Sequence, residues 1–360
     1  MNWQHQLFFL KFIKLNVIFQ FIFISAHIAF SLILKPISNY FSRRKKRILI
    51  DARDKIRELI EKERPWPKGL FSHKLCKIPF LVPLVLNIDK ENQSEHWMEM
   101  RKSLFTNILF PKAKKLTYTK KWTKKIQAIA CFFHFPNSIN EKEILHLLKD
   151  TTPVIKYSAA ACAAKLGTSA AANAIIDEMN CNRFLRFPFR ESLLKGNPKS
   201  FSYIEERLEK DKDPWTRVSC LEVLSYNMNS HIVDLAKRDL HASHKNLRIA
   251  AIRAISHYLD PVSNSLLIPL LKDSEWEVRA VSARCLGYLK AKEAIDELAF
   301  LLTDKSWWVR INSALALKRL GEDGIQVLKQ QNIEKDRFAY EAAQYALTLD
   351  IDDGKNPPGN

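Results

Sequence analysis

The chain has 360 residues, 47% of them hydrophobic and 27% charged, a balance typical of a folded protein rather than a disordered one. Its eight glycines are scattered, which excludes glycine-rich phosphate-binding loops and favours helices. None of the six cysteines forms a CxxC pair, so a disulfide-stapled or zinc-finger fold is disfavoured and a reducing compartment is expected.

The formal charge of +18 is concentrated at the N-terminal end of the chain. Residues 1–125 contain 26 Lys and Arg against 9 Asp and Glu, a net of +17, whereas the other 235 residues contain 31 against 30. Binding to nucleic acid needs a surplus of cations on the contact surface. We therefore expect no nucleic-acid partner for the C-terminal two thirds, and we keep nucleic-acid binding only as an alternative function.

One apolar segment near the N-terminus is long enough to cross a membrane. After an N-terminal tail at residues 1–14, residues 15–34 (LNVIFQFIFISAHIAFSLIL) carry no charge, and only Asn16, Gln20 and His27 weaken the signal. At about 1.5 Å per residue, a helix of this length spans a hydrocarbon core of roughly 30 Å. The sequence thus predicts one transmembrane helix. A cleavable signal peptide is the alternative, which the apolar run beyond residues 29–31 disfavours.

A basic block follows the apolar segment. Lys35 and the five residues Arg43–Arg47 outweigh Lys11 and Lys14 on the other side. Because positive residues stay in the cytoplasm, this asymmetry predicts a single-pass protein of the bacterial inner membrane with its C-terminal bulk on the cytoplasmic side. The block Arg43–Arg47 is also expected to hold anionic lipid headgroups, at about 1 kcal/mol per residue, unless it acts only as a topology signal.

Residues 35–93 are predicted to form a basic juxtamembrane helix and a linker. Helical spacing of apolar residues indicates a helix over residues 48–64, which Pro65 and Pro67 end. Residues 78–88 are apolar but contain two prolines, so a buried connector is expected there. Residues 94–124 are expected to be a helical cap or a degenerate repeat.

A repeat of about 31 residues occupies the rest of the chain. A basic residue begins each small-residue-rich helix, at intervals of 30 or 31, namely at Lys125, Lys156, Arg186, Arg217, Arg248, Arg279 and Arg310. Six residues after each anchor stands a small or β-branched residue, and seven after it an apolar one. Such fixed periods indicate stacked identical units, and we interpret the small column, which includes Cys131, Cys162 and Cys285, as packing residues.

An aspartate stands six residues before several anchors and is followed by a short polar turn. Before each turn lies another apolar helix, so helix, turn and helix recur and predict an all-α fold, an α-solenoid, over residues 125–348. The helix beginning at Arg337 is expected to cap the array, and residues 349–360 to be a disordered tail. The proline at position 188 predicts an irregular repeat near residues 181–198.

The segment LLKDSEWEVRAVSARCLGYLKAKEAIDELAFLLTDKSWWVRINSALALKRLG resembles the HEAT-repeat family, in the short variety named after phycobilisome lyases. The resemblance implies an armadillo/HEAT-type superhelix in which each Asp accepts hydrogen bonds from turn backbone and stacked Arg side chains tie neighbouring turns into a ladder. The ladder residues would be Asp150, Asp211, Arg217, Arg248, Asp273, Arg279, Asp304 and Arg310.

The second helix of each repeat is expected to line a concave groove, with the fifth and ninth positions after the anchor facing outward. These columns make the candidate protein-binding residues Glu191, Glu222, Arg253, Arg284, Tyr226, His257, Tyr288 and Arg319, a groove that changes from acidic to basic. An ordinary solvated face is the alternative. Four tryptophans on the turns, at positions 215, 276, 307 and 308, are expected to pack over the adjacent repeat, with Trp307 more exposed than Trp308.

No nucleophile, zinc-protease, P-loop or dinucleotide motif occurs, and no His-Glu dipeptide of the kind carried by HEAT-like iron hydroxylases. The best metal candidate, His73 and Cys76 with Cys131 and His134, is weak because Cys131 belongs to the packing column. We therefore expect no cofactor, no metal and no enzyme activity. The leading hypothesis is a membrane-anchored scaffold or adaptor for a protein partner; the alternative is an accessory enzyme of the lyase or isomerase type.

Overall fold

Helices joined by short turns follow one another along the chain in the computed structural model. The structure describes residues 19–20, 22–23, 39–40, 42–44, 46–67, 77–227, 229–258 and 261–350. Those residues form helices and turns and contain no strand, which confirms the all-α prediction for the described part. The chain divides into two units, Met1–Lys112 and Ala113–Asn360.

The described residues of the first unit form three main helical stretches: residues 46–61, α2 (Ile78–Glu91) and α3 (Glu95–Leu104). Trp97 is fully buried, and its indole Nε1 donates to Asp89 at 2.8 Å. Trp66 packs edge-on against it, and the Trp66 indole donates to the Met100 carbonyl at 2.8 Å. Since both indole nitrogens have acceptors, neither the buried Trp97 nor the half-buried Trp66 has an unsatisfied donor.

Residues 78–88, expected to be a buried connector, are buried as expected but form most of the helix α2. Pro79 lies in the first turn, where a backbone N–H has no helical partner, so it costs little there. Pro83 lies inside the helix and removes one hydrogen bond. Six apolar side chains of α2 are buried, and that burial offsets the lost bond.

The predicted transmembrane helix and single-pass membrane location are contradicted. Among the described residues, no helix has the length and apolar character that crossing a bilayer requires. Most of residues 15–34 lie outside the described part of the chain, as do residues 351–360 of the predicted tail. In the basic block, Arg43, Arg44, Lys46 and Arg47 are exposed, and lipid binding by them stays a prediction.

The second unit begins at Ala113, within α4 (Phe110–Thr117) and before residue 125, the predicted start of the repeats. After α4, the unit consists of paired helices. The helices of the pairs are α5 (Trp122–His134), α6 (Glu141–Leu148), α7 (Pro153–Leu166), α8 (Ser169–Cys181), α9 (Arg186–Leu194), α10 (Lys199–Lys210), α11 (Pro214–Leu224), α12 (Ser230–Asp239), α13 (Lys245–His257), α14 (Pro261–Leu267), α15 (Trp276–Tyr288), α16 (Ile295–Phe300), α17 (Trp307–Arg319), α18 (Glu322–Lys329) and α19 (Arg337–Thr348).

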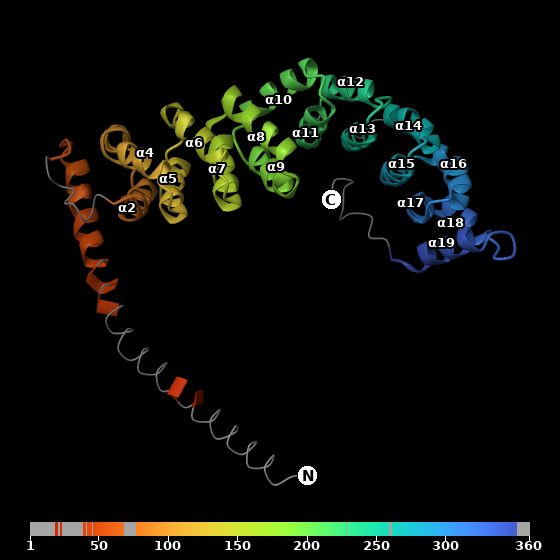
Figure 1. The fold of residues 1–360 in the computed structure, drawn as a ribbon, viewed down its shortest axis with the longest axis horizontal. Helices are drawn as coiled ribbons and strands as arrows, with labels where there is room; N and C mark the ends of the chain where they lie inside the picture. The colour runs from red at the N-terminus through yellow and green to blue at the C-terminus, as the bar shows by residue number, and fades with distance from the viewer. Residues whose placement is uncertain are drawn as a thin grey trace, which may run out of the picture. The chain divides into compact units, whose positions relative to one another are not determined.

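These helices form two rows within the second unit. Consecutive odd-numbered helices from α5 to α19 pack side by side, and so do α6, α8, α10 and α12. Figure 1 shows the odd-numbered helices on the inner side of the curve and the even-numbered ones on the outer side. We name the odd-numbered helices the inner row. This arrangement is that of an α-solenoid.

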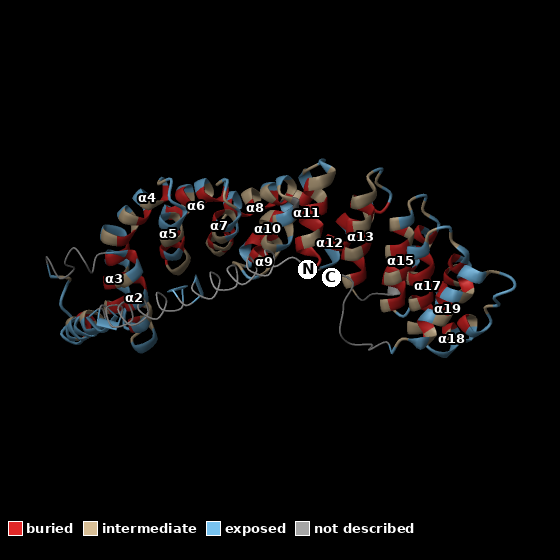
Figure 2. Ribbon diagram, turned by 60° about the horizontal axis from the view of Figure 1, so that its bottom comes forward, coloured by how far each residue is buried: buried red, intermediate tan, exposed pale blue. Residues whose placement is uncertain are grey.

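The small and apolar columns of the repeat form the core between the rows. The residues six and seven positions after each anchor are all buried, from Cys131 and Phe132 to Ala316 and Leu317. Figure 2 shows buried positions in red along α11, α13, α15 and α17. Helices approach most closely where the small residues lie: a Cβ built on Gly287 of α15 would lie 2.7 Å from Cα of Ala316 of α17.

The repeat around residues 181–198 is irregular, as the proline predicts. A 3₁₀ turn at Arg183–Leu185 precedes α9, which has only nine residues. At the end of α9, the backbone N–H of Asn197 donates across the repeats to the carbonyl of Ala164 at 2.8 Å. Gly196 permits this approach, since a Cβ there would lie 2.7 Å from that carbonyl oxygen.

Aspartates organise the turns between the helices of each pair. One carboxylate oxygen accepts the backbone N–H two residues further on in each of four turns, from Asp150, Asp211, Asp273 and Asp304, at 2.8 to 2.9 Å. This bond closes the turn and prepares the start of the next helix.

Arginines join each turn to the next one. The Nη1 of Arg279 donates to the carbonyl of Asp273 in its own turn at 2.8 Å, while Nε and Nη2 donate to the carboxylate of Asp304 in the next turn at 2.7 and 2.9 Å. Arg248 bonds the Ala242 carbonyl and Asp273 in the same way, both at 2.8 Å. The side chains of these pairs are between 8% and 17% exposed.

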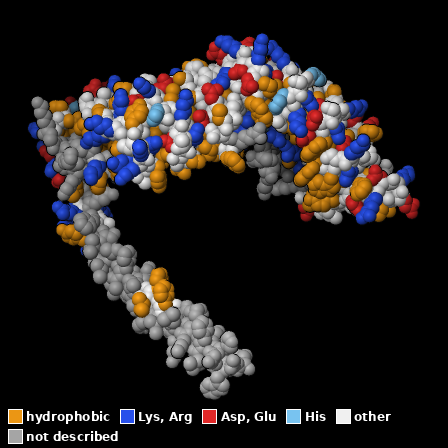
Figure 3. Space-filling view, viewed as in Figure 1, with side chains coloured by type: hydrophobic (Ala, Val, Ile, Leu, Met, Phe, Trp, Pro, Cys, Tyr) orange, Lys and Arg blue, Asp and Glu red, His pale blue; other side chains and the backbone are white. Residues whose placement is uncertain are grey.

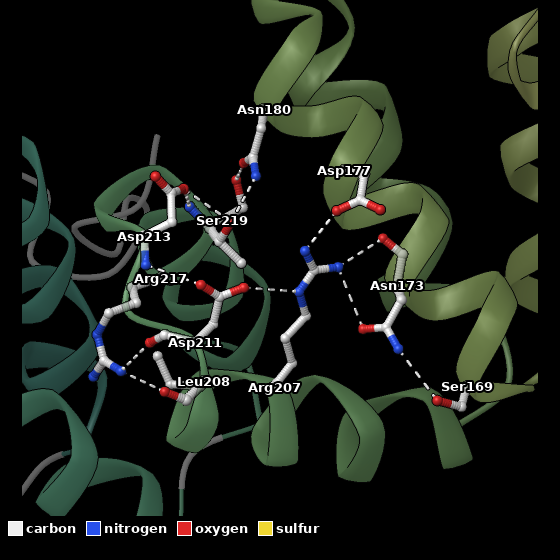
Figure 4. Close-up of polar contacts among 11 residues, drawn as sticks. Ser169, Asn173, Asp177, Asn180, Arg207, Leu208, Asp211, Asp213, Arg217 and Ser219 are labelled. Atoms are coloured by element: carbon white, nitrogen blue, oxygen red, sulfur yellow. Dashed lines mark hydrogen bonds and ion pairs between the residues drawn. The ribbon is translucent and has the colours of Figure 1, made fainter.

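The ladder changes its acceptor where the Asp column is interrupted. Arg217 binds the carboxylate of Asp239, on the last turn of α12, at 2.8 to 3.1 Å, and the carbonyl of Asp211 at 3.0 Å. On the outer row, Arg207 of α10 donates to the Asn173 carbonyl and to Asp177 of α8, at 2.9 and 2.5 Å (Figure 4). Arg310, at the end of the array, donates to the Asp304 carbonyl at 2.8 Å and lies 5.0 Å from the ring of Phe338.

Replacing Gly287 with alanine is expected to destabilise the repeat unit. The added methyl group meets the backbone of Ala316, which has no freedom to move aside, and such overpacking costs about 1–3 kcal/mol. Alanine gains at most about 1 kcal/mol of helix propensity over glycine, so the steric cost dominates. Urea unfolding of Gly287→Ala should show a lower midpoint. A midpoint equal to or above that of the wild type would contradict the close approach of α15 and α17.

Removing Asp304 is expected to cost roughly 3 kcal/mol of unfolding free energy, because Arg279 would keep a largely buried charge without its partner. The matched control is Asp323→Ala, which breaks the exposed 2.9 Å pair with Lys292 and should cost about 1 kcal/mol or less. Denaturant unfolding of both variants gives the comparison. Equal losses would show that the ladder pair contributes no more than a surface ion pair.

Acidification should weaken the ladder. Burial alone would raise the pKa of Asp304, but the hydrogen bonds from Arg279 and the Ser306 N–H outweigh it and hold that pKa below its ordinary value of 3.8. Because the folded-state pKa lies below the unfolded one, the stabilisation is complete above about pH 4 and is lost as the pH falls through the folded-state value. Unfolding midpoints of Asp304→Asn should therefore fall less between pH 5 and pH 2 than those of the wild type.

Candidate protein-binding groove

The structure places the eight candidate residues on the inner row or at its helix ends. Glu191 lies on α9, Glu222 on α11 and Tyr226 just after α11, while α13 carries Arg253 and His257, α15 carries Arg284 and Tyr288, and α17 carries Arg319. The helices follow one another in space, so these positions succeed one another along one side of the second unit (Figure 1).

Four of these residues line one pocket. The pocket has a volume of about 240 Å³ and lies between α9, α11 and α13. Its polar and aromatic walls are formed by Arg186, Phe187, Arg190, Glu222, Tyr226, Arg253 and His257. Arg284, Tyr288 and Arg319 lie further along the row and are not among its walls.

An ion pair between two repeats forms one side of the pocket. The Nε of Arg186 donates to the carboxylate of Glu222 at 2.6 Å. The side chains are 17% and 24% exposed, so the pair is only partly open to water. Arg186 is an anchor of the repeat pattern, yet it binds a groove residue instead of a turn aspartate. Asn180 stands in the Asp column of this repeat and donates to Thr216 at 3.0 Å.

Arg190 lies against two aromatic rings in the pocket. Its guanidinium carbon lies 4.9 Å from the ring centre of Phe187 and 5.2 Å from that of Tyr226. Both distances allow cation–π attraction. The ring of Tyr226 also lies 5.4 Å from that of His257. These contacts hold Tyr226 in place although its side chain is exposed at 43%.

Burial lowers the pKa values of two pocket residues. Burial, followed by the nearby charge of Arg190, lowers the pKa of His257 below its ordinary value, so the imidazole is neutral at pH 7. Burial and the like charge of Arg284 lower the pKa of Arg253, although an arginine stays charged throughout the physiological range. The pocket walls thus contain three positive side chains and one negative side chain.

The predicted change from acidic to basic along the groove is not seen at the pocket. Glu222 is paired with Arg186, and Glu191 lies 3.1 Å from Lys195 and 3.9 Å from Arg190. The glutamates of the expected acidic end are therefore balanced by cations from α9. Further along the row, Arg319 lies 4.3 Å from the ring centre of Tyr288 and donates to its hydroxyl at 3.4 Å.

The prediction that the turn tryptophans are packed away is wrong for three of them. Trp276, Trp307 and Trp308 are 40%, 52% and 55% exposed, so Trp307 is not the more exposed of its pair. Trp215 alone fits the expectation, because it is half-buried and its ring lies 4.9 Å from that of His244. Figure 3 shows hydrophobic side chains gathered near α17.

The metal candidate from the sequence is not assembled in the described structure. His73 and Cys76 lie outside the described residues. Cys131 is buried, and burial raises the pKa of its thiol to about 12, so it offers no thiolate at neutral pH. Among the residues that the structure describes, no three His, Cys, Asp or Glu side chains form a group able to hold a metal ion.

Comparisons with known proteins agree with the repeat architecture. Residues 264–348 match the family described as HEAT repeats. No curated protein matches the chain. Similar solved structures include human deoxyhypusine hydroxylase in complex with glycerol, at 16% identity over 68% of this chain and 97% of that one, with a TM-score of 0.29.

Two further structures have comparable scores. YibA of Escherichia coli is 17% identical over 72% of this chain and 98% of that one, with a TM-score of 0.39. The complex of CpcE and CpcF of phycocyanin lyase from Nostoc sp. is 19% identical over 66% and 93%, with a TM-score of 0.31. At such identities, nothing about activity passes from these proteins to this chain.

The family match covers the last part of the array, where the Asp273 and Asp304 turns and their arginines are most regular. The same helix pairs continue towards the N-terminus as far as α5. The family match thus identifies HEAT repeats over residues 264–348, and the paired helices continue the same architecture from there back to α5.

Proposed function

We propose that the repeat unit is a non-catalytic scaffold that binds a protein partner along its inner row. The observation that carries this proposal is the exposed Tyr226, which lines the pocket and contacts Arg190 and His257. Tyrosine and arginine are enriched among the residues that dominate protein–protein affinity. A tyrosine fixed by its neighbours loses little conformational entropy on binding.

The same chemistry recurs further along the inner row. Tyr288 of α15 is covered by Arg319 of α17, as Tyr226 is contacted by Arg190. An extended partner lying across several repeats would therefore meet aromatic rings and guanidinium groups at more than one step. Solenoids commonly use such continuous concave surfaces for binding.

Site-specific crosslinking tests the surface directly. A photoreactive phenylalanine analogue at position 226 of the full-length protein should give a discrete crosslinked product in cells, because the partner is expected to cover this side chain. The control is the same analogue at Phe300 on the outer row, an aromatic residue that is 73% exposed. That position should give no such product.

A second substitution separates binding from chance proximity. Adding Arg319→Glu should reduce the crosslink at position 226 several-fold, because the partner would lose a second contact on the same row. The melting temperature of the double variant should stay within a few degrees of that of the single one. Equal crosslinking at positions 226 and 300, or a crosslink insensitive to Arg319→Glu, would contradict the inner row as the binding surface.

A further inference from the structure

The pocket between α9, α11 and α13 has more positive charge than its own residues neutralise. Three arginines and one glutamate line it, and Glu222 is already engaged by Arg186 at 2.6 Å. Of the other two guanidinium groups in the same small space, that of Arg190 lies 3.9 Å from Glu191, which also pairs with Lys195 at 3.1 Å, and no carboxylate of the described residues lies within 4 Å of that of Arg253. Like charges held together in a partly dry site repel one another, so the pocket favours an anion.

Buried guanidinium nitrogens without an acceptor occur both in the pocket and in the turn ladder. Within the described part of the chain this holds for Nη2 of Arg186 and Nε of Arg190 and Arg253 in the pocket, and for Nε of Arg248 and Arg310 in the ladder. These atoms therefore do not mark a ligand site, and the charge of the pocket carries the inference. The nearest carboxylate to Arg190 is that of Glu191, at 3.9 Å, which is too long for a hydrogen bond.

The pocket also holds Arg190 in a defined position. Phe187 and Tyr226 contact its guanidinium at 4.9 and 5.2 Å, so the planar donor group is oriented before any ligand arrives. An oriented guanidinium suits an oxyanion that accepts two parallel hydrogen bonds. The volume of about 240 Å³ admits a compact charged group rather than a large ring system.

We propose that this pocket binds the phosphoryl group of a phosphorylated segment of the protein partner, with Arg190 and Arg253 as its ligands. A phosphate monoester carries about −1.5 to −2 charges at pH 7, which matches the two guanidinium groups left over in the pocket. A carboxylate would neutralise only one of them. This inference rests on the proposed scaffold function and names what the groove recognises.

The pocket arginines Arg190 and Arg253 should lower the stability of the fold but be needed for binding the phosphoryl group. Arg253→Gln removes a half-buried charge that lies near the like charge of Arg284, so its melting temperature should equal or exceed that of the wild type. A structural arginine, such as those of the turn ladder, would behave in the opposite way. This difference keeps the test informative even though the substitution lies in the protein interior.

Calorimetric titration of the full-length protein tests the proposal. The probes are inorganic phosphate, a short peptide with one phosphoserine, its unphosphorylated form and a single-stranded oligonucleotide. We expect the phosphopeptide to bind at least about tenfold more tightly than the unphosphorylated peptide, and inorganic phosphate to compete with it. Arg253→Gln and Arg190→Gln should each remove this difference. The control Arg238→Gln, which changes an exposed arginine of α12 outside the pocket, should keep it.

Several results would overturn the inference. Equal affinity for the two peptides, or equal effects of Arg253→Gln and Arg238→Gln, would show that the pocket does not recognise a phosphoryl group. Tighter binding of inorganic phosphate or of the oligonucleotide than of the phosphopeptide would assign the site to a free anion or a nucleic acid instead. A lowered melting temperature of Arg253→Gln would make the arginine structural.

The two proposals fail in distinguishable ways. If peptide selectivity is absent while the crosslink at position 226 persists, the phosphoryl inference falls and the scaffold stands. If phosphate binds through Arg253 while no crosslink forms at position 226, the scaffold proposal is contradicted, and so is a protein partner as the source of the phosphoryl group. Only anion binding by the pocket is then supported.

Discussion

The second unit depends on one double contact made by an arginine at each regular turn. Arg279 donates to a carbonyl of its own turn and to the carboxylate of the next turn, so one side chain fixes two neighbouring repeats at once. The bond is possible because Asp304 is itself fixed by the Ser306 N–H. Repeats that touch only their neighbours have no long-range contacts to correct an error, so each such link has to set the geometry locally.

The periodic part of the structure could be read from the sequence because it repeats. The anchors, the buried columns and the turn aspartates all follow from a period near 31, and each column is a packing requirement met many times over. The two prolines of α2 misled the prediction, since a proline in the first turn of a helix costs little and burial compensates for the second. The turn tryptophans misled it in the opposite direction, because large apolar rings are often buried but three of these are exposed.

The pocket could be predicted only in part. Tyr226, Glu222, Arg253 and His257 belong to periodic columns and were found in this way. Phe187 and Arg190 belong to no column, and Arg186 was identified only as an anchor of the repeat. The available signal was the irregular segment RFPFR, where two arginines four residues apart share one helix face. Their meeting with Glu222 and Tyr226 depends on how α9 packs beside α11, which no local pattern describes.

The altered role of Arg186 has a mechanical consequence. The ion pairs Arg248–Asp273 and Arg279–Asp304 join neighbouring repeats at the turns. The pair Arg186–Glu222 instead joins two repeats in the wall of the pocket. Whatever enters the pocket therefore touches the joint itself and competes for the atoms that hold two repeats at their spacing. In a solenoid, small rotations between units add up along the axis. A ligand that shifts the Arg186–Glu222 pair would therefore change the curvature of the array, and a change in curvature would change the affinity of the pocket.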